Sequence, residues 1–87
     1  MNTDPAEQAI LETLRALGAG KSISPVDAAR AMAGNPKDES WRRGLAPVRL
    51  AAQRLARAGQ IEILRKGKPI DPSTLHGVLR LRLTAGE

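Results

Sequence analysis

Three cationic side chains surround a single glycine in the segment Arg65-Lys66-Gly67-Lys68. The segment lies between two stretches whose apolar residues alternate, a pattern typical of β-strands. Glycine tolerates the positive φ angle of a tight turn, so we expect a β-hairpin with positive charge at its tip. Long cationic side chains at such a tip can reach a phosphate backbone. They can also keep the hairpin edge from pairing with other chains, and this segment alone leaves both roles open.

A second group of candidate residues lies on a predicted helix from Pro47 to Ala58. One arc of this helix is apolar and should be buried: Val48, Ala51, Ala52 and Leu55. The opposite arc holds Arg49, Leu50, Gln53, Arg54 and Arg57. Arginine can bind guanine edges or phosphates and glutamine can pair with adenine, so this acid-free face predicts a recognition helix. The alternative is an ordinary solvated face, although such faces usually mix charges of both signs.

Two apolar residues near this helix need separate interpretation. Leu50 does not suit phosphate binding; it could touch a thymine methyl group, pack under the preceding loop or belong to a dimer interface. We expect an ordinary exposed leucine, because single exposed apolar residues are common.

Trp41 is the only aromatic residue and is expected to anchor the core. With no aromatic residue on a predicted strand, RNA-binding platforms of the RNA-recognition-motif and OB types are excluded.

No combination of residues predicts catalysis or metal binding. Cysteine is absent, and the sole histidine, His76, has no predicted nucleophile or second histidine near it. The stretch GAGKS at 18–22 is not a P-loop, because Arg15 replaces the required glycine and a helix precedes it instead of a strand. We therefore expect a protein without enzymatic activity, metal or cofactor.

Charge is distributed unevenly along the chain, whose formal net charge is +5. Residues 1–40 carry four Lys or Arg and six Asp or Glu, a net charge of −2. Residues 41–87 carry ten Lys or Arg and three Asp or Glu, a net charge of +7. Cations gathered in one half of a small domain predict a polyanionic partner, with a solubilising surface charge as the alternative.

Two helices are predicted before Trp41. Asp4 and Pro5 are typical of a helix start, and apolar residues at helical spacing follow until Gly18. Ser24 and Pro25 repeat these signals for a shorter helix that ends at Gly34 and Pro36. The segment 41–45 is expected to form a separate helical turn before the helix that begins at Pro47. A single kinked helix from Trp41 is the alternative.

Two strands complete the predicted fold, one at 60–64 and one at 79–83. Three helices followed by a two-stranded antiparallel wing is the order of a winged helix-turn-helix, so we expect one mainly α domain over residues 1–87, with a small β-hairpin. The chain contains no apolar run long enough to span a membrane and no signal segment, so we expect no membrane contact and a cytoplasmic location.

Three stretches together resemble a small bacterial domain family of unknown function: GKSISPVDAARAM, WRRGLAPVRLAAQRLARAGQIEI and RKGKPIDPSTLHGVLRLRL. Members of that family combine a GKS-I-x-P entry, a W-R-x-L…V-R segment and a K-G-x-P-x-D-P wing, in that order. The resemblance covers about residues 8 to 83. It implies a winged-helix-like fold, and it brings no activity, ligand or functional residue.

The function expected from the sequence is binding of double-stranded DNA, as a small winged-helix protein or transcriptional regulator. The helix face would enter the major groove, with Arg42 and Arg43 on nearby phosphates and Arg65, Lys66 and Lys68 on the flanking backbone. The connection between the second and third helices is longer than in a typical helix-turn-helix, which affects how the third helix docks. A protein-interaction module on an acidic partner and an RNA-binding protein are the alternatives. The oligomeric state, the DNA sequence and any effector stay open.

Overall fold

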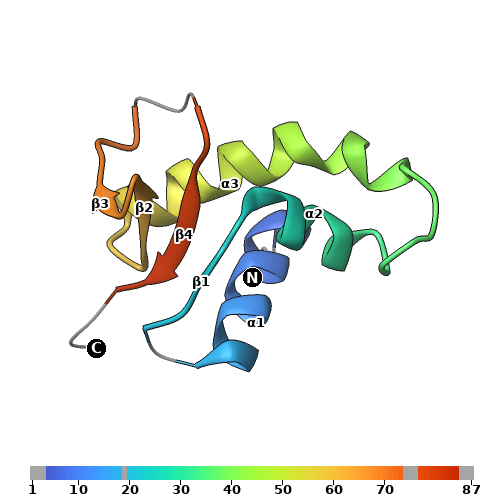
Figure 1. The fold of residues 1–87 in the computed structure, drawn as a ribbon, viewed down its shortest axis with the longest axis horizontal. Helices are drawn as coiled ribbons and strands as arrows, with labels where there is room; N and C mark the ends of the chain where they lie inside the picture. The colour runs from blue at the N-terminus through green and yellow to red at the C-terminus, as the bar shows by residue number, and fades with distance from the viewer. Residues whose placement is uncertain (1–3, 19, 74–76, 85–87) are drawn as a thin grey trace.

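Helices and short strands alternate in the computed structural model, which describes residues 4–18, 20–73 and 77–84. Within these ranges α1 and α2 lie before the third helix, and most of the sheet follows it at one end of the molecule (Figure 1). The elements in chain order are α1 (Pro5–Leu17), β1 (Ser22–Ile23), α2 (Pro25–Met32), the 3₁₀ helix η1 (Ser40–Gly44), α3 (Leu45–Arg57), β2 (Ile61–Arg65), β3 (Lys68–Pro69) and β4 (Arg80–Leu83).

Side-chain caps start the first two helices where the sequence predicts them. The carboxylate of Asp4 accepts hydrogen bonds from the backbone N–H groups of Ala6 and Glu7, at 2.8 and 3.2 Å. Ser24 and Asp27 form a reciprocal capping box, in which each side chain accepts from the other residue's backbone N–H. These bonds satisfy donors that lack partners within the first helical turn. The predicted starts of α1 and α2 are confirmed.

The third helix begins two residues earlier than predicted. Leu45 is the first residue of α3, and Pro47 therefore lies within the first turn. Proline costs no hydrogen bond there, since the first backbone N–H groups of a helix have no acceptor. The predicted separate turn is present as η1, which ends at Gly44. A Cβ atom on Gly44 would lie 2.6 Å from Met32 Cε, so glycine lets this junction pack closely on α2.

The sheet has four strands among the described residues, where the sequence predicted two. Its order is β1-β4-β2-β3, and each neighbouring pair is antiparallel. β1 comes from the connection between α1 and α2, so the sheet includes more than the predicted hairpin. β1 and β3 have two residues each, too few for an alternating pattern to be recognised in the sequence.

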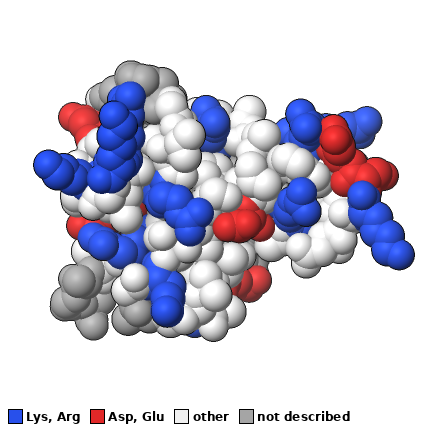
Figure 2. Space-filling view, viewed as in Figure 1, with Lys and Arg blue, Asp and Glu red and all other residues white. Residues whose placement is uncertain are grey.

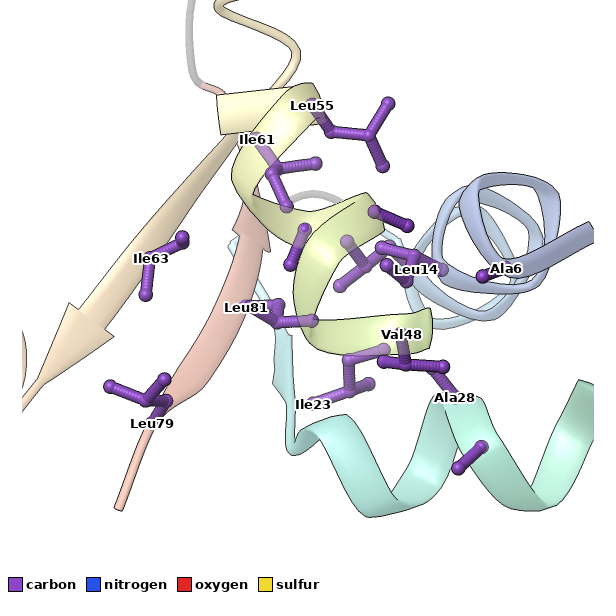
Figure 3. Close-up of a cluster of buried hydrophobic side chains, with 14 of the residues drawn as sticks. Ala6, Leu14, Ile23, Ala28, Val48, Leu55, Ile61, Ile63, Leu79 and Leu81 are labelled. Atoms are coloured by element: carbon purple, nitrogen blue, oxygen red, sulfur yellow. The ribbon is translucent and has the colours of Figure 1, made fainter. Parts of the chain in front are cut away.

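One row of apolar residues crosses the sheet and joins it to the helices. Leu81 on β4 is in register with Ile23 on β1 and with Ile63 on β2, and all three are fully buried. The side chains of Ile23 and Leu81 point toward α3, where Val48 is also fully buried (Figure 3). Trp41 is part of the same core, as predicted. Aliphatic packing between three strands and the helices therefore holds the domain together.

Truncation of the central strand residue should be costly. We expect Leu81→Ala to lower the free energy of unfolding by about 2–5 kcal/mol, because it leaves a cavity at the middle of the buried row. Urea denaturation followed by Trp41 fluorescence measures this loss. Leu83→Ala, in the same strand but only half-buried, is the matched control and should cost less. Equal losses at the two positions would contradict the central place of Leu81.

Candidate nucleic-acid interface

The two faces of α3 differ in burial as the sequence predicts. The apolar arc formed by Val48, Ala51, Ala52 and Leu55 is buried in the core. On the opposite arc, Arg49, Leu50, Arg54 and Arg57 are exposed and Gln53 is half-buried. Exposure alone does not make a cation available to a ligand, however, because neighbouring elements can already bind it. The contacts of each candidate side chain decide which of them can bind a phosphate or a base.

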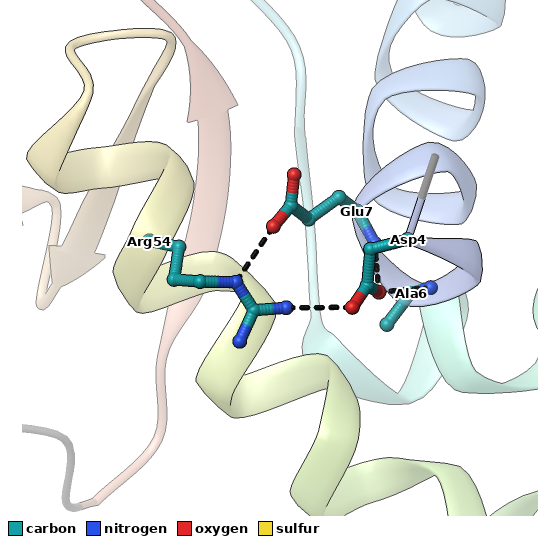
Figure 4. Close-up of polar contacts among 4 residues, drawn as sticks. All are labelled: Asp4, Ala6, Glu7 and Arg54. Atoms are coloured by element: carbon teal, nitrogen blue, oxygen red, sulfur yellow. Dashed lines mark hydrogen bonds and ion pairs between the residues drawn. The ribbon is translucent and has the colours of Figure 1, made fainter. Parts of the chain in front are cut away.

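Arg54 is bound to the start of α1. Its Nε donates to a carboxylate oxygen of Glu7 at 2.6 Å, and its NH2 donates to Asp4 at 2.9 Å (Figure 4). The hydrogen bond to Glu7 is the main reason why the pKa of the Arg54 guanidinium is raised. Asp4 also caps α1, so a single cluster fixes both the helix start and its contact with α3. The predicted role of Arg54 in the major groove therefore competes with two ion pairs.

Gln53 is bound on the other side of α3. Its side-chain amide donates to the backbone carbonyl of Pro72 at 2.7 Å, which ties the segment after β3 to the helix. The neighbouring Asp71 accepts from the backbone N–H and the hydroxyl of Ser73. These bonds, with a smaller contribution from the positive charge of Arg57, hold the pKa of Asp71 below its usual value. Gln53 thus has a structural partner, and Arg57 has an acidic neighbour.

The hairpin between β2 and β3 has the tight turn that its glycine predicts. Arg65 pairs with Lys68, and the two residues between them, Lys66 and Gly67, have φ angles of 54° and 80°. Two positive φ angles in a two-residue hairpin loop are typical of a type I′ turn. Lys66 and Lys68 are exposed, whereas Arg65 is half-buried. A Cβ atom on Gly77 would lie 3.4 Å from Arg65 Nε, so Arg65 extends along the sheet toward Gly77.

The two candidate cations of η1 have different surroundings. Arg42 forms an ion pair with Glu39 at 2.9 Å, and its guanidinium lies 5.3 Å from the centre of the Trp41 ring. Arg43 is exposed and takes part in no ion pair with another described residue. Of these two residues, Arg43 is therefore the one whose charge is not already neutralised.

Five candidate cations remain without an ion pair to another described residue and are also exposed: Arg43, Arg49, Arg57, Lys66 and Lys68. In Figure 2, Lys and Arg predominate over the end of the molecule that carries the sheet, whereas both signs are interleaved at the opposite end, around η1. The basic end therefore includes the hairpin and the end of α3.

Sequence reasoning missed the residues that bind the two arginines of β4. Arg80 donates to the hydroxyl and the carbonyl of Ser22, and Arg82 forms an ion pair with Glu62 at 2.7 Å. The pairing of Arg82 with Glu62 follows from strand register, which places the two residues opposite each other. That register could have been inferred once the two strands were aligned by their buried residues. No sequence signal indicates the contact of Arg54 with Asp4, which lies 50 residues away.

The described residues also lack the features of two other classes of site. No group of three or more metal-binding side chains lies close enough together there to hold an ion. None of the helices in these ranges is both long and apolar enough to cross a lipid bilayer. The sole histidine, His76, lies outside the described residues.

The chain belongs to the family described as "Protein of unknown function (DUF3253)", whose model matches residues 3–84. The expectation that the chain belongs to a domain family of unknown function is thereby confirmed. No curated protein matches this chain.

Removing the Arg54 guanidinium should destabilise the contact between α1 and α3 in a salt-dependent way. We expect Arg54→Gln to lower the urea midpoint at low salt, because both ion pairs are lost. At about 1 M salt the Debye length is about 3 Å, so the difference from the wild type should shrink. Arg49→Gln is the control, since Arg49 forms no ion pair with the described residues. A similar loss in both variants would show that the ion pairs do not stabilise the fold.

Proposed function

We propose that this member of the DUF3253 family is a non-enzymatic protein that binds double-stranded DNA through α3 and the β2–β3 hairpin. The observation that carries the proposal is the set of exposed cations without an ion-pair partner among the described residues: Arg49 and Arg57 on α3, and Lys66 and Lys68 at the turn. Cations presented on a helix and on a nearby hairpin suit the phosphates of a duplex, which attract them without regard to sequence. Arg43 on η1 would add a further phosphate contact.

The order of elements supports a winged-helix arrangement. Three helices pack against an antiparallel sheet, and the last long connection, between β2 and β4, carries the basic turn as a wing would. In such an arrangement α3 is the recognition helix and the hairpin lies beside the duplex. The long connection between α2 and α3 is compatible with this role, because η1 packs on α2 through Gly44 and through Trp41, whose ring centre lies 4.8 Å from the Arg30 guanidinium. The connection therefore holds α3 against α2 despite its length.

The conformation of Lys66 is a second argument for a phosphate-binding turn. A side chain at a φ angle of 54° is uncommon, and glycine or asparagine would adopt this conformation at a lower cost. A residue that keeps an unfavourable backbone conformation often serves a function rather than the fold. A long, exposed cation in the turn of the hairpin is consistent with contact to a phosphate.

A protein partner is the second candidate, favoured by a groove between α1 and α2. This open groove has a volume of about 600 Å³, and its apolar residues include Ala16, Leu17, Ile23 and Ala31. Leu17 is 51% exposed, so this groove offers a large apolar side chain to a partner. The basic end of the molecule could also dock on an acidic protein. This candidate predicts saturable binding to a protein and only weak attachment to DNA.

Fluorescence anisotropy with a random-sequence duplex, at low and near-physiological salt, separates the two candidates. For DNA binding, the logarithm of the affinity should fall with the logarithm of the salt concentration, with a slope of about 0.9 for each phosphate contact. If the duplex does not bind even at low salt, the DNA-binding proposal is wrong and the protein partner becomes the leading candidate. Competition with duplex RNA distinguishes binding of DNA from binding of RNA by shape.

Charge reversal on α3 tests which face binds the duplex. We expect Arg57→Glu to weaken duplex binding severalfold or more, because it replaces a phosphate-attracting cation with an anion beside Asp71. Arg15→Glu makes the same change of charge on the exposed surface of α1 and is the matched control. It should weaken binding much less in the same anisotropy titration. Equal effects would mean that only the net charge matters and that α3 is not the binding face.

Replacement of Lys66 should change stability and binding in opposite directions. Asn-Gly is the preferred pair for a type I′ turn, so Lys66→Asn should raise the free energy of unfolding by about 0.5–1 kcal/mol. The same change should weaken duplex binding and reduce the salt slope by about 0.9, because one phosphate contact is lost. Lys66→Arg keeps the charge and should leave the salt slope as it is. A stabilised Lys66→Asn variant with unchanged binding would exclude the turn from the interface.

A further inference from the structure

Leu50 is the exposed large apolar residue of α3, with 56% of its surface accessible. It lies on the outward arc of the helix, next to Arg49 in sequence and two turns before Arg57, and both arginines are exposed. Ala46, one turn earlier on the same side, is also exposed. Leu50 is therefore not covered by the preceding loop, which was one of the roles open from the sequence. The outward arc therefore presents an exposed apolar side chain together with two exposed cations, Arg49 and Arg57.

Two of the polar side chains on this arc that could read bases, Gln53 and Arg54, are held by other parts of the protein. Gln53 donates to the carbonyl of Pro72, and Arg54 is bound by Asp4 and Glu7. To pair with adenine or guanine, each of them would first have to give up a hydrogen bond of 2.9 Å or shorter. Leu50 has no such constraint. It can make contact with a ligand without breaking any interaction within the domain.

We propose that Leu50 contacts the C5-methyl group of thymine in the major groove, and that the protein consequently favours sites rich in A·T base pairs. This inference rests on the proposed function, because it requires α3 to face the duplex. Thymine alone among the four bases presents a methyl group in the major groove, and apolar side chains recognise it there. Arg49 and Arg57 are exposed on the same outward arc, and their positive charge complements DNA phosphates, which favours DNA over a protein as the occupant of this face.

Hairpin duplexes that differ only in this methyl group provide the test. One contains alternating deoxyadenosine and thymidine, and the other has deoxyuridine in place of every thymidine. The minor groove and the base-pairing edges are the same in both, so a difference in affinity reports the methyl group. We expect the wild type to bind the thymidine hairpin roughly fourfold more tightly, the factor that corresponds to burial of one methyl group. A guanine–cytosine hairpin should likewise gain affinity when its cytosines carry a 5-methyl group.

Leu50→Ala should abolish the preference for the methylated hairpins while it keeps the salt-dependent part of binding. The fold should tolerate this change, because the side chain is exposed and alanine favours helix; thermal melting checks it. Leu17→Ala removes a similarly exposed leucine from α1 and should keep the full preference. Binding without a preference in the wild type, or a preference that survives in Leu50→Ala, would overturn the inference and leave the proposed function in place. Failure to bind any hairpin at low salt would overturn both.

Discussion

Antiparallel pairing of β4 with β1 on one side and β2 on the other joins the two halves of the chain. Without this pairing, β2 and β3 would form a two-stranded hairpin with no larger sheet to join, and isolated two-stranded hairpins are marginally stable. The buried row Ile23, Leu81 and Ile63 carries the connection into the core, where it meets α3. The position of the hairpin relative to α3 therefore depends on three aliphatic side chains. The core has a single aromatic residue, so no other large side chains are present to compensate for a loss of packing in this row.

The helices could be predicted because their signals are local. Caps such as Asp4 and Ser24 act within a few residues of their own positions, and the buried arc of α3 follows from helical periodicity alone. The strand β1 could not be predicted in the same way. It has two residues, and it exists because β4, almost 60 positions later in the chain, offers a free edge to pair with. The start of α3 was missed for a different reason: proline marks the first turn of a helix but not which residue of that turn it occupies.

The positive charge of the candidate site could be predicted from the sequence. Which of its cations are free to bind a ligand could not. A helical wheel places Arg49, Arg54 and Arg57 on one face, and the structure exposes all three. Only the tertiary contact shows that Arg54 is already paired, because its partners Asp4 and Glu7 belong to another helix. The same holds for Gln53 and the carbonyl of Pro72. Counting cations along a sequence therefore overestimates a binding surface whenever the other half of the domain carries the compensating acids, as residues 1–40 do here.

The acids that bind Arg54 also limit the proposed interface. Asp4 and Glu7 lie beside α3 on the α1 side, and Asp71 lies in the segment after β3, near Arg57. Phosphates would be repelled at both borders, so a duplex could approach α3 only along the strip that carries Arg49, Leu50 and Arg57. So narrow a strip would neutralise few phosphates, and few counterions would therefore be released from the DNA. Non-specific affinity depends on the number of counterions released. Within the proposed function, a single domain would thus bind random DNA weakly. Most of its discrimination would then have to come from contacts with the base edges in the groove.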